Sequence, residues 1–270
     1  MRFKNIVLLL TSTINPDGMA NTSVQDSNTR MSQYLEAIDF YLSQTECKII
    51  VCENTGYDFY SNINNSSKYS RVEFLTFQGN NYNKSWGKDL GEVNIINHAI
   101  CNSEFIKHSD FIIKITGRVK ILNINNLIKK LSKISHNYSV AGELIYSRWI
   151  STVCIAFSKA WLQNNVKNQS FEMLMTPNYL LENFFYDKLR QSDKLKLISF
   201  YPIISGISGS FNRPYSDYPE YNYNLYNRKL NNKALRYKLF KQRQDYNQYL
   251  VFKFSWILYL IKWKFLGIFQ

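Results

Sequence analysis

The stretch Phe111-Ile-Ile-Lys-Ile-Thr-Gly-Arg118 decides the fold of this chain. Its residues from Phe111 to Ile115 are apolar except for Lys114, and Thr116 and Gly117 then open a loop. A short apolar run of this kind predicts a strand that is buried on both faces. Such strands occur mainly in parallel sheets that helices cover on both sides, so the stretch indicates the α/β class.

Similar segments surround this strand. Short apolar runs that predict further strands lie at residues 5–10, 48–52 and 71–77, and the region 140–157 is strand-like. Apolar residues at helical spacing predict helices from Thr29, over 91–102, over 127–134 and near 177–189, the last beginning at Thr176-Pro177. Strands that alternate with helices predict a mainly parallel, Rossmann-type sheet flanked by helices. Ligands bind beyond the carboxyl ends of such strands, so the loops 11–17, 53–58 and 116–123 are the expected binding loops.

The chain is strongly basic. It has 270 residues with 33 Lys and Arg against 20 Asp and Glu, which gives a net charge of +13. This charge indicates an anionic partner, which could be nucleic acid, an acidic membrane surface or a phosphorylated small molecule. The four cysteines form no CxxC pair and have no histidines at metal-ligand spacing, so we expect reduced thiols.

The basic residues concentrate at the carboxyl end. Between Arg228 and Lys264 there are ten basic residues and one acid, Asp245, mixed in the last third with aromatic and aliphatic side chains. A spanning helix needs roughly 20 apolar residues, and the lysines interrupt that pattern. We therefore expect a basic amphipathic helix on an anionic membrane surface, or alternatively one packed on its own domain. The predicted division is a catalytic domain at 1–211, a linker or loop at 212–227 and the tail at 228–270.

The order of these segments resembles the GT-A glycosyltransferases, and more narrowly those of bacterial capsule, O-antigen and lipooligosaccharide loci. Four stretches carry the resemblance: Leu10-Thr-Ser-Thr13 with Asn28-Thr-Arg30, Val51-Cys-Glu-Asn-Thr-Gly-Tyr-Asp58, Gly87-Lys-Asp-Leu-Gly-Glu92, and Lys114-Ile-Thr-Gly-Arg118. The resemblance implies a nucleotide-binding half at about 1–125 and an acceptor half at about 126–211. It also implies a nucleotide-sugar donor, by default a UDP-sugar, with a cytidine nucleotide left open.

The resemblance implies the following donor contacts. Thr11, Thr13 and Arg30 would line the nucleotide pocket, and Glu53 would accept hydrogen bonds from the base or ribose. Lys88 would meet a phosphate at the start of a helix, where Gly91 allows close approach of the backbone. The alternative for Glu53 and for the 87–92 segment is a solvated, charged loop.

The chain departs from the family at one position. The strand at 111–115 usually ends there in Asp-x-Asp, which holds a divalent metal, but no carboxylate occurs between Phe111 and Asn126. We therefore expect donor activation without metal. Arg118 is the first candidate to neutralise the departing diphosphate, and Lys114 is the second. Alternation along a strand would place Lys114, Thr116 and Arg118 on one face. The alternative is that Lys114 and Arg118 form structural ion pairs.

The acceptor hydroxyl needs a base, and two carboxylates are candidates. Glu182 near a helix start is slightly favoured over Glu143. The predicted protein is thus a glycosyltransferase with no cofactor or metal, acting on a cell-surface glycan or lipid-linked acceptor. It would lie peripherally on the cytoplasmic face of the inner membrane. Two other functions stay open: an inactive membrane-associated scaffold, and a basic nucleic-acid-binding protein, although no nucleic-acid motif is present.

Overall fold

The computed structural model describes residues 5–59, 61, 66–134, 139–146, 149–167, 169, 179–192, 196–210 and 212–217. The predicted tail at 228–270 and residues 218–227 of the predicted linker lie outside these residues. In the described part, no helix is both long and apolar enough to span a membrane.

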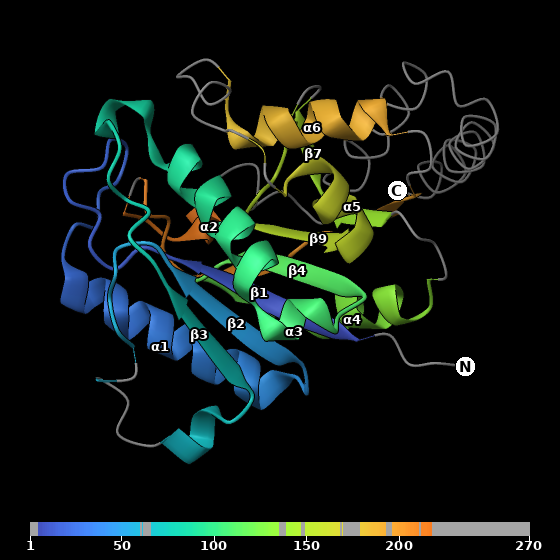
Figure 1. The fold of residues 1–270 in the computed structure, drawn as a ribbon, viewed down its shortest axis with the longest axis horizontal. Helices are drawn as coiled ribbons and strands as arrows, with labels where there is room; N and C mark the ends of the chain where they lie inside the picture. The colour runs from blue at the N-terminus through green and yellow to red at the C-terminus, as the bar shows by residue number, and fades with distance from the viewer. Residues whose placement is uncertain are drawn as a thin grey trace, which may run out of the picture.

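A seven-stranded sheet in the order β10-β6-β9-β4-β1-β2-β3 forms the centre of the fold (Figure 1). Its strands are β1 (Ile6–Ser12), β2 (Lys48–Glu53), β3 (Val72–Thr76), β4 (Phe111–Thr116), β6 (Ser139–Gly142), β9 (Cys154–Ser158) and β10 (Lys196–Ser199). The strands β3, β2, β1 and β4 run parallel, whereas β9 is antiparallel to both β4 and β6. This confirms the predicted α/β class with a mostly parallel sheet.

Helices cover both faces of the sheet, and each face has its own apolar core. The helices α2 (Lys88–Asn102), α5 (Lys159–Asn165) and α6 (Leu181–Gln191) supply one core. On the other face, α1 (Ser27–Gln44) and α4 (Ile124–Ser132) supply the second core. β1 contributes to both, because its residues alternate between Val7 and Leu9 on one face and Leu8 and Leu10 on the other.

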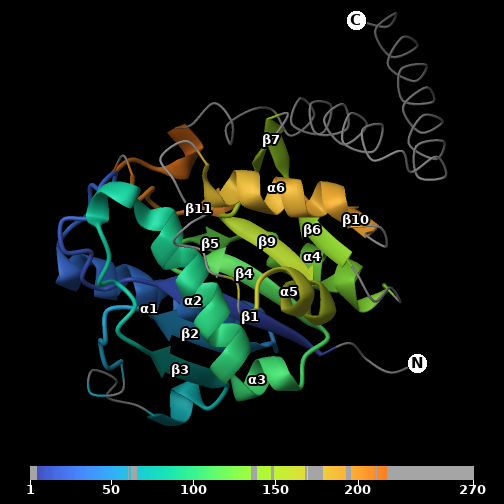
Figure 2. The same cartoon turned by 45° about the horizontal axis from the view of Figure 1, so that its top comes forward.

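Smaller elements complete the fold (Figure 2). They are η2 (Ser66–Tyr69), η3 (Lys84–Trp86), α3 (Glu104–Lys107), β5 (Lys120–Ile121), β7 (Leu144–Tyr146), β8 (Trp149–Ile150), β11 (Ile204–Ser205) and η4 (Tyr215–Asp217). The late strand β11 pairs antiparallel with β5, just after β4. This pairing brings residues 204–210 and 212–217 back to the carboxyl edge of the parallel strands.

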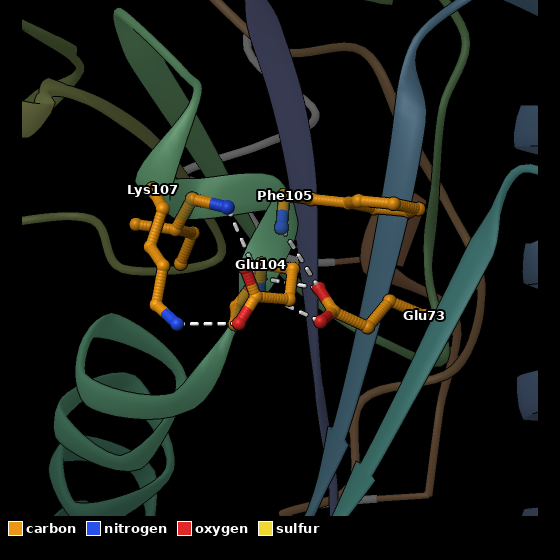
Figure 3. A network of polar contacts seen from close by, with 6 residues as sticks. Glu73, Glu104, Phe105 and Lys107 are labelled. Carbon is orange, nitrogen blue, oxygen red and sulfur yellow. Dashed lines mark hydrogen bonds and ion pairs between the residues drawn. The ribbon is translucent and has the colours of Figure 1, made fainter.

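A carboxylate from the sheet holds the point at which α2 ends and α3 begins. Glu73 of β3 accepts hydrogen bonds from Ser103 Oγ and from the backbone N–H groups of Glu104 and Phe105, at the start of α3 (Figure 3). Free N–H groups at a helix start favour a negative charge there. Lys107 completes the network through an ion pair with Glu104. Because α2 leads directly into α3, this contact anchors the helix whose other end faces the candidate site.

Two predicted helix starts are wrong. α1 begins earlier than predicted, because the side chain of Asp26 accepts a 2.6 Å hydrogen bond from Thr29 N and acts as the N-cap. α6 begins at Leu181, after the predicted start at Thr176-Pro177, which lies outside the described residues. Its first N–H is bonded by a carboxylate from another helix, since Leu181 N donates to Asp89 Oδ2 at 3.2 Å. Both starts thus depend on carboxylates, one local and one distant.

Candidate functional site

A cavity of about 150 Å³ lies at the carboxyl ends of β1 and β4. Parallel α/β sheets bind ligands at this edge. The predicted site residues that line the cavity are Thr11, Thr13, Arg30, Lys88, Gly91, Thr116, Arg118 and Glu182. The structure therefore brings together residues from both predicted halves of the domain. Glu53, Lys114 and Glu143 are not part of the cavity wall.

Arg30 lies in the first turn of α1 and is only 5% exposed. Its guanidinium donates from Nε to Thr13 O at 2.6 Å and from Nη1 to Val24 O at 3.1 Å. Its Nη2 donates to the hydroxyl of Tyr34, one turn further along the helix, at 3.3 Å. These contacts orient the guanidinium toward the loop after β1, but they bring it no negative charge.

Arg118 follows β4 in a tight turn and is 7% exposed. The turn needs Gly117, because a Cβ there would lie 2.6 Å from Thr11 O. Arg118 Nη1 donates to Gln33 Oε1 at 2.7 Å. Burial lowers the pKa of Arg118, and the nearby charge of Arg30 lowers it further. An arginine remains protonated despite such shifts, so the cavity wall carries two buried positive charges.

Neither guanidinium forms an ion pair with a carboxylate among the residues that the structure describes. Buried charges are normally compensated by a partner, since an uncompensated one is costly. The shared cavity of Arg30 and Arg118 is thus suited to an anionic ligand. Guanidinium groups bind phosphates through two parallel hydrogen bonds, so a phosphate or diphosphate fits this wall best.

The prediction that Lys114, Thr116 and Arg118 share one face is wrong. β4 ends at Thr116, and the turn at Gly117 and Arg118 breaks the alternation of the strand. Lys114 is fully buried, forms an ion pair with Glu92 of α2 and donates to Thr152 O at 2.6 Å. Arg118 instead contacts α1, on the opposite face of the sheet. Lys114 therefore has the structural ion pair that was the alternative interpretation for it.

Glu53 organises the loop that follows β2. Its carboxylate accepts from the backbone N–H groups of Ile14, Thr55 and Tyr57 at 3.0, 2.8 and 2.9 Å. The side chain is fully buried. With its oxygens occupied in this way, Glu53 holds together the loops after β1 and β2 and lies behind the cavity wall. Glu53 therefore has a structural role, and its contact with a base or ribose stays a prediction.

Glu182 lies in the first turn of α6 and faces the cavity. Its Oε1 accepts a 2.8 Å hydrogen bond from Thr152 Oγ1. Burial, together with the neighbouring carboxylates Asp89 and Glu92, raises the pKa of Glu182 to about 7. A carboxylate with a pKa near the working pH can both take up and release a proton. Glu143, the other candidate, is buried in the connection between β6 and β7.

The structure adds cavity residues that the sequence did not indicate. They include Tyr34, Glu92, Thr152, Gly209 and Tyr215, with Gln33 behind Arg118. Tyr34 lies four residues after Arg30, so helical spacing could have indicated it. Gly209 carries no such signal, although a Cβ there would lie 2.2 Å from Arg118 Nη2. Its position depends on long-range contacts such as the 2.7 Å hydrogen bond from Ser23 N to Gly209 O.

Among the residues for which the structure gives a placement, no group of three or more His, Cys, Asp or Glu side chains is arranged to hold a metal ion. Metal-independent activity stays a prediction, which needs a test in solution.

Comparisons with known proteins found solved structures to which this chain is similar at low sequence identity. No protein-family model matches the chain, and no curated protein sequence is significantly similar to it. A proposed nucleotide-diphospho-sugar transferase from Desulfovibrio desulfuricans G20 is 10% identical, with a TM-score of 0.46 over 86% of this chain and 96% of its own. HddC from Yersinia pseudotuberculosis is 15% identical, with a TM-score of 0.36 over 75% and 93%.

The galactosyltransferase LgtC, in complex with donor and acceptor sugar analogues, is 9% identical, with a TM-score of 0.43 over 71% of this chain and 72% of its own. Identities and scores this low do not assign an activity.

Proposed function

We propose that this chain is a glycosyltransferase that moves a sugar from a nucleotide-sugar donor to a carbohydrate-containing acceptor. The observation that carries the proposal is one cavity with two different walls. Arg30 and Arg118 form a buried cationic wall without a carboxylate partner among the described residues, and Glu182 stands on the other wall with its pKa raised to about 7. Transfer from a nucleoside diphosphate needs both an anion site and a base.

The cationic wall would bind the diphosphate of the donor. Arg30 and Arg118 are held in place by Thr13 O and Gln33 Oε1, so their guanidinium groups need little reorganisation when charge develops on the leaving group. Lys88 adds a third cation at the start of α2, where backbone N–H groups also favour an anion. With three cations available, the proposed activation of the donor does not require a metal. A UDP-sugar is the proposed donor.

The acidic wall would activate the acceptor. In a transfer with inversion at the anomeric carbon, Glu182 takes the proton of the attacking hydroxyl group. Thr152 orients the carboxylate of Glu182 through its hydroxyl group, and Lys114 holds the backbone carbonyl of the same Thr152. Lys114 is thus proposed as a positioning residue that acts through Thr152 and Glu92.

A cell-surface glycan or lipid-linked acceptor is proposed because of the tail at 228–270, with its ten basic residues between Arg228 and Lys264 and interleaved aromatic side chains. Basic residues of this kind are attracted to anionic lipids, and aromatic ones to the headgroup region. We propose that the enzyme lies peripherally on the cytoplasmic face of the inner membrane. Removal of the residues after Asn247 should release the protein from anionic vesicles and spare activity on a soluble acceptor. Sedimentation of the truncated protein with the vesicles would contradict the membrane role of the tail.

A thermal-shift screen tests the proposed donor. Nucleoside diphosphates and nucleotide sugars of uridine, cytidine, guanosine and adenosine are added to the full chain, each with and without EDTA. We expect the nucleotides of one of these bases to raise the melting temperature of the protein, by the same amount with and without EDTA. If no nucleotide changes it, the proposed function is wrong; if only Mn²⁺ restores the shift, donor activation depends on metal.

A further inference from the structure

A second cavity of about 370 Å³ adjoins the first. The two cavities share Lys88, Val153, Glu182 and Tyr215 in their walls. The second cavity opens between η3, β8 and the start of α6. On the basis of the proposed function, we propose that it is the acceptor site and that it binds a sugar ring between tryptophan side chains.

Two indole rings support a carbohydrate ligand. Trp86 at the end of η3 and Trp149 in β8 both line the cavity, although they come from distant parts of the chain. Trp86 is 38% exposed, so a ligand in the cavity can reach its ring. A pyranose presents a face of C–H groups, and the electron-rich face of an indole attracts such groups. Polar side chains for the hydroxyl groups lie in the same wall, namely Asn21, Ser85, Ser151 and Ser210.

The charges of the second cavity distinguish it from the first. Its wall contains two carboxylates, Asp89 and Glu182, and one cation, Lys88, whose Nζ donates to Ser210 Oγ at 2.5 Å. Arg30 and Arg118 line only the first cavity. A second nucleotide could stack on the indoles as well, but the two carboxylates would repel its phosphates. A neutral ligand with many hydroxyl groups therefore fits this cavity better.

The shared Glu182 connects the two cavities chemically. With the donor in the first cavity, an acceptor hydroxyl in the second would face the anomeric carbon from the side of Glu182. The hydroxyl oxygen forms the new bond to the anomeric carbon while the bond from that carbon to the diphosphate oxygen breaks. The diphosphate leaves with the bonding electron pair toward Arg30 and Arg118, and the hydroxyl proton passes to Glu182. No further reactant is needed.

A glycan array probed with the full chain and saturating UDP tests this assignment. We expect the wild-type protein to bind at least one glycan, and Trp86→Ala and Trp149→Ala each to weaken that binding by about tenfold or more, the effect expected for tryptophans that dominate the energy of a binding site. Trp86→Phe, which keeps an aromatic face, should retain most of the affinity. Leu122→Ala, an exposed apolar residue away from both cavities, is the control.

Binding of UDP by the same variants separates the two proposals. UDP affinity should be unchanged in both tryptophan variants, which also shows that they are folded. If the wild type binds UDP but no glycan, or if its glycan binding survives both alanine substitutions, the acceptor site is wrong. If the wild type binds no nucleotide at all, the proposed function itself fails.

Discussion

The two walls of the first cavity differ in how their buried charges are compensated. On the α2 and α6 side, burial and the nearby carboxylates Asp89 and Glu92 raise the pKa of Glu182. The buried cation Lys114 compensates this negative charge through its ion pair with Glu92. On the α1 side, burial and the charge of Arg30 lower the pKa of Arg118, and the hydrogen-bond acceptors of both guanidinium groups among the described residues are neutral. The acidic wall has its compensating cation, Lys114, within the fold, whereas we propose that a ligand compensates the cationic wall. This difference is what a donor site next to a catalytic base requires.

The largest expected effect comes from Glu182→Gln. The amide keeps the shape of the side chain but cannot take a proton, so transfer should fall by roughly 10²- to 10⁴-fold. The measurement is the rate of sugar transfer at saturating donor, with Asp187→Asn as a control for an acidic residue on the same helix. A variant that retains full activity would show that another group is the base.

Arg118→Ala removes one of the two cations that face the leaving diphosphate. Transfer should fall by on the order of 10²-fold, the effect of losing one main electrostatic donor in an active site. Arg190→Ala, on an exposed position of α6, is the matched control and should behave like the wild type. Equal activity of the two variants would remove Arg118 from the mechanism.

Lys114→Met should destabilise the fold, because it leaves Glu92 near two other carboxylates without its buried partner. The loss in the free energy of unfolding is expected to be about 3 kcal/mol or more. The matched control is Lys120→Met, which breaks the exposed pair with Glu36 and should cost at most about 1 kcal/mol. Urea unfolding measures both, and equal losses would show that Lys114 does not have this role.

The pH dependence follows from the raised pKa of Glu182. The base is active when deprotonated, so kcat/KM should rise with pH and level off above an apparent pKa of about 7. Below that value the rate should fall by about tenfold per pH unit. For stability the sign is opposite, because protons bound by Glu182 stabilise the folded state below its pKa and are lost as pH rises through about 7. A rate that is flat between pH 5 and 8 would contradict the role of Glu182.

The strands could be predicted closely from the sequence, since a buried apolar run leaves little choice. The segment predicted at 48–52 is Lys48–Glu53, and that at 111–115 is Phe111–Thr116. The start of α1 was harder, because Asp26-Ser-Asn-Thr offers four consecutive residues that can act as an N-cap. Only the 2.6 Å bond from Thr29 N to Asp26 identifies the cap in use.

The site was partly predictable. Arg118 and Glu182 follow from their places after a strand and near a helix start, and both line the cavity. The side on which Lys114 lies could not be predicted, because it depends on where β4 ends relative to the turn at Gly117. The contribution of residues 204–217 rests on the pairing of β11 with β5, and no local pattern indicates such a long-range contact.

The most direct test of the cationic wall is the affinity for UDP, measured by isothermal titration calorimetry in EDTA. Three proteins suffice: the wild type, Arg118→Ala and Glu182→Gln. We predict that the wild type binds UDP without metal, that Arg118→Ala raises the Kd by about thirtyfold or more, and that Glu182→Gln leaves the Kd nearly unchanged. Binding that requires Mn²⁺, or an Arg118→Ala variant with the wild-type Kd, would contradict the assignment of this wall to the diphosphate.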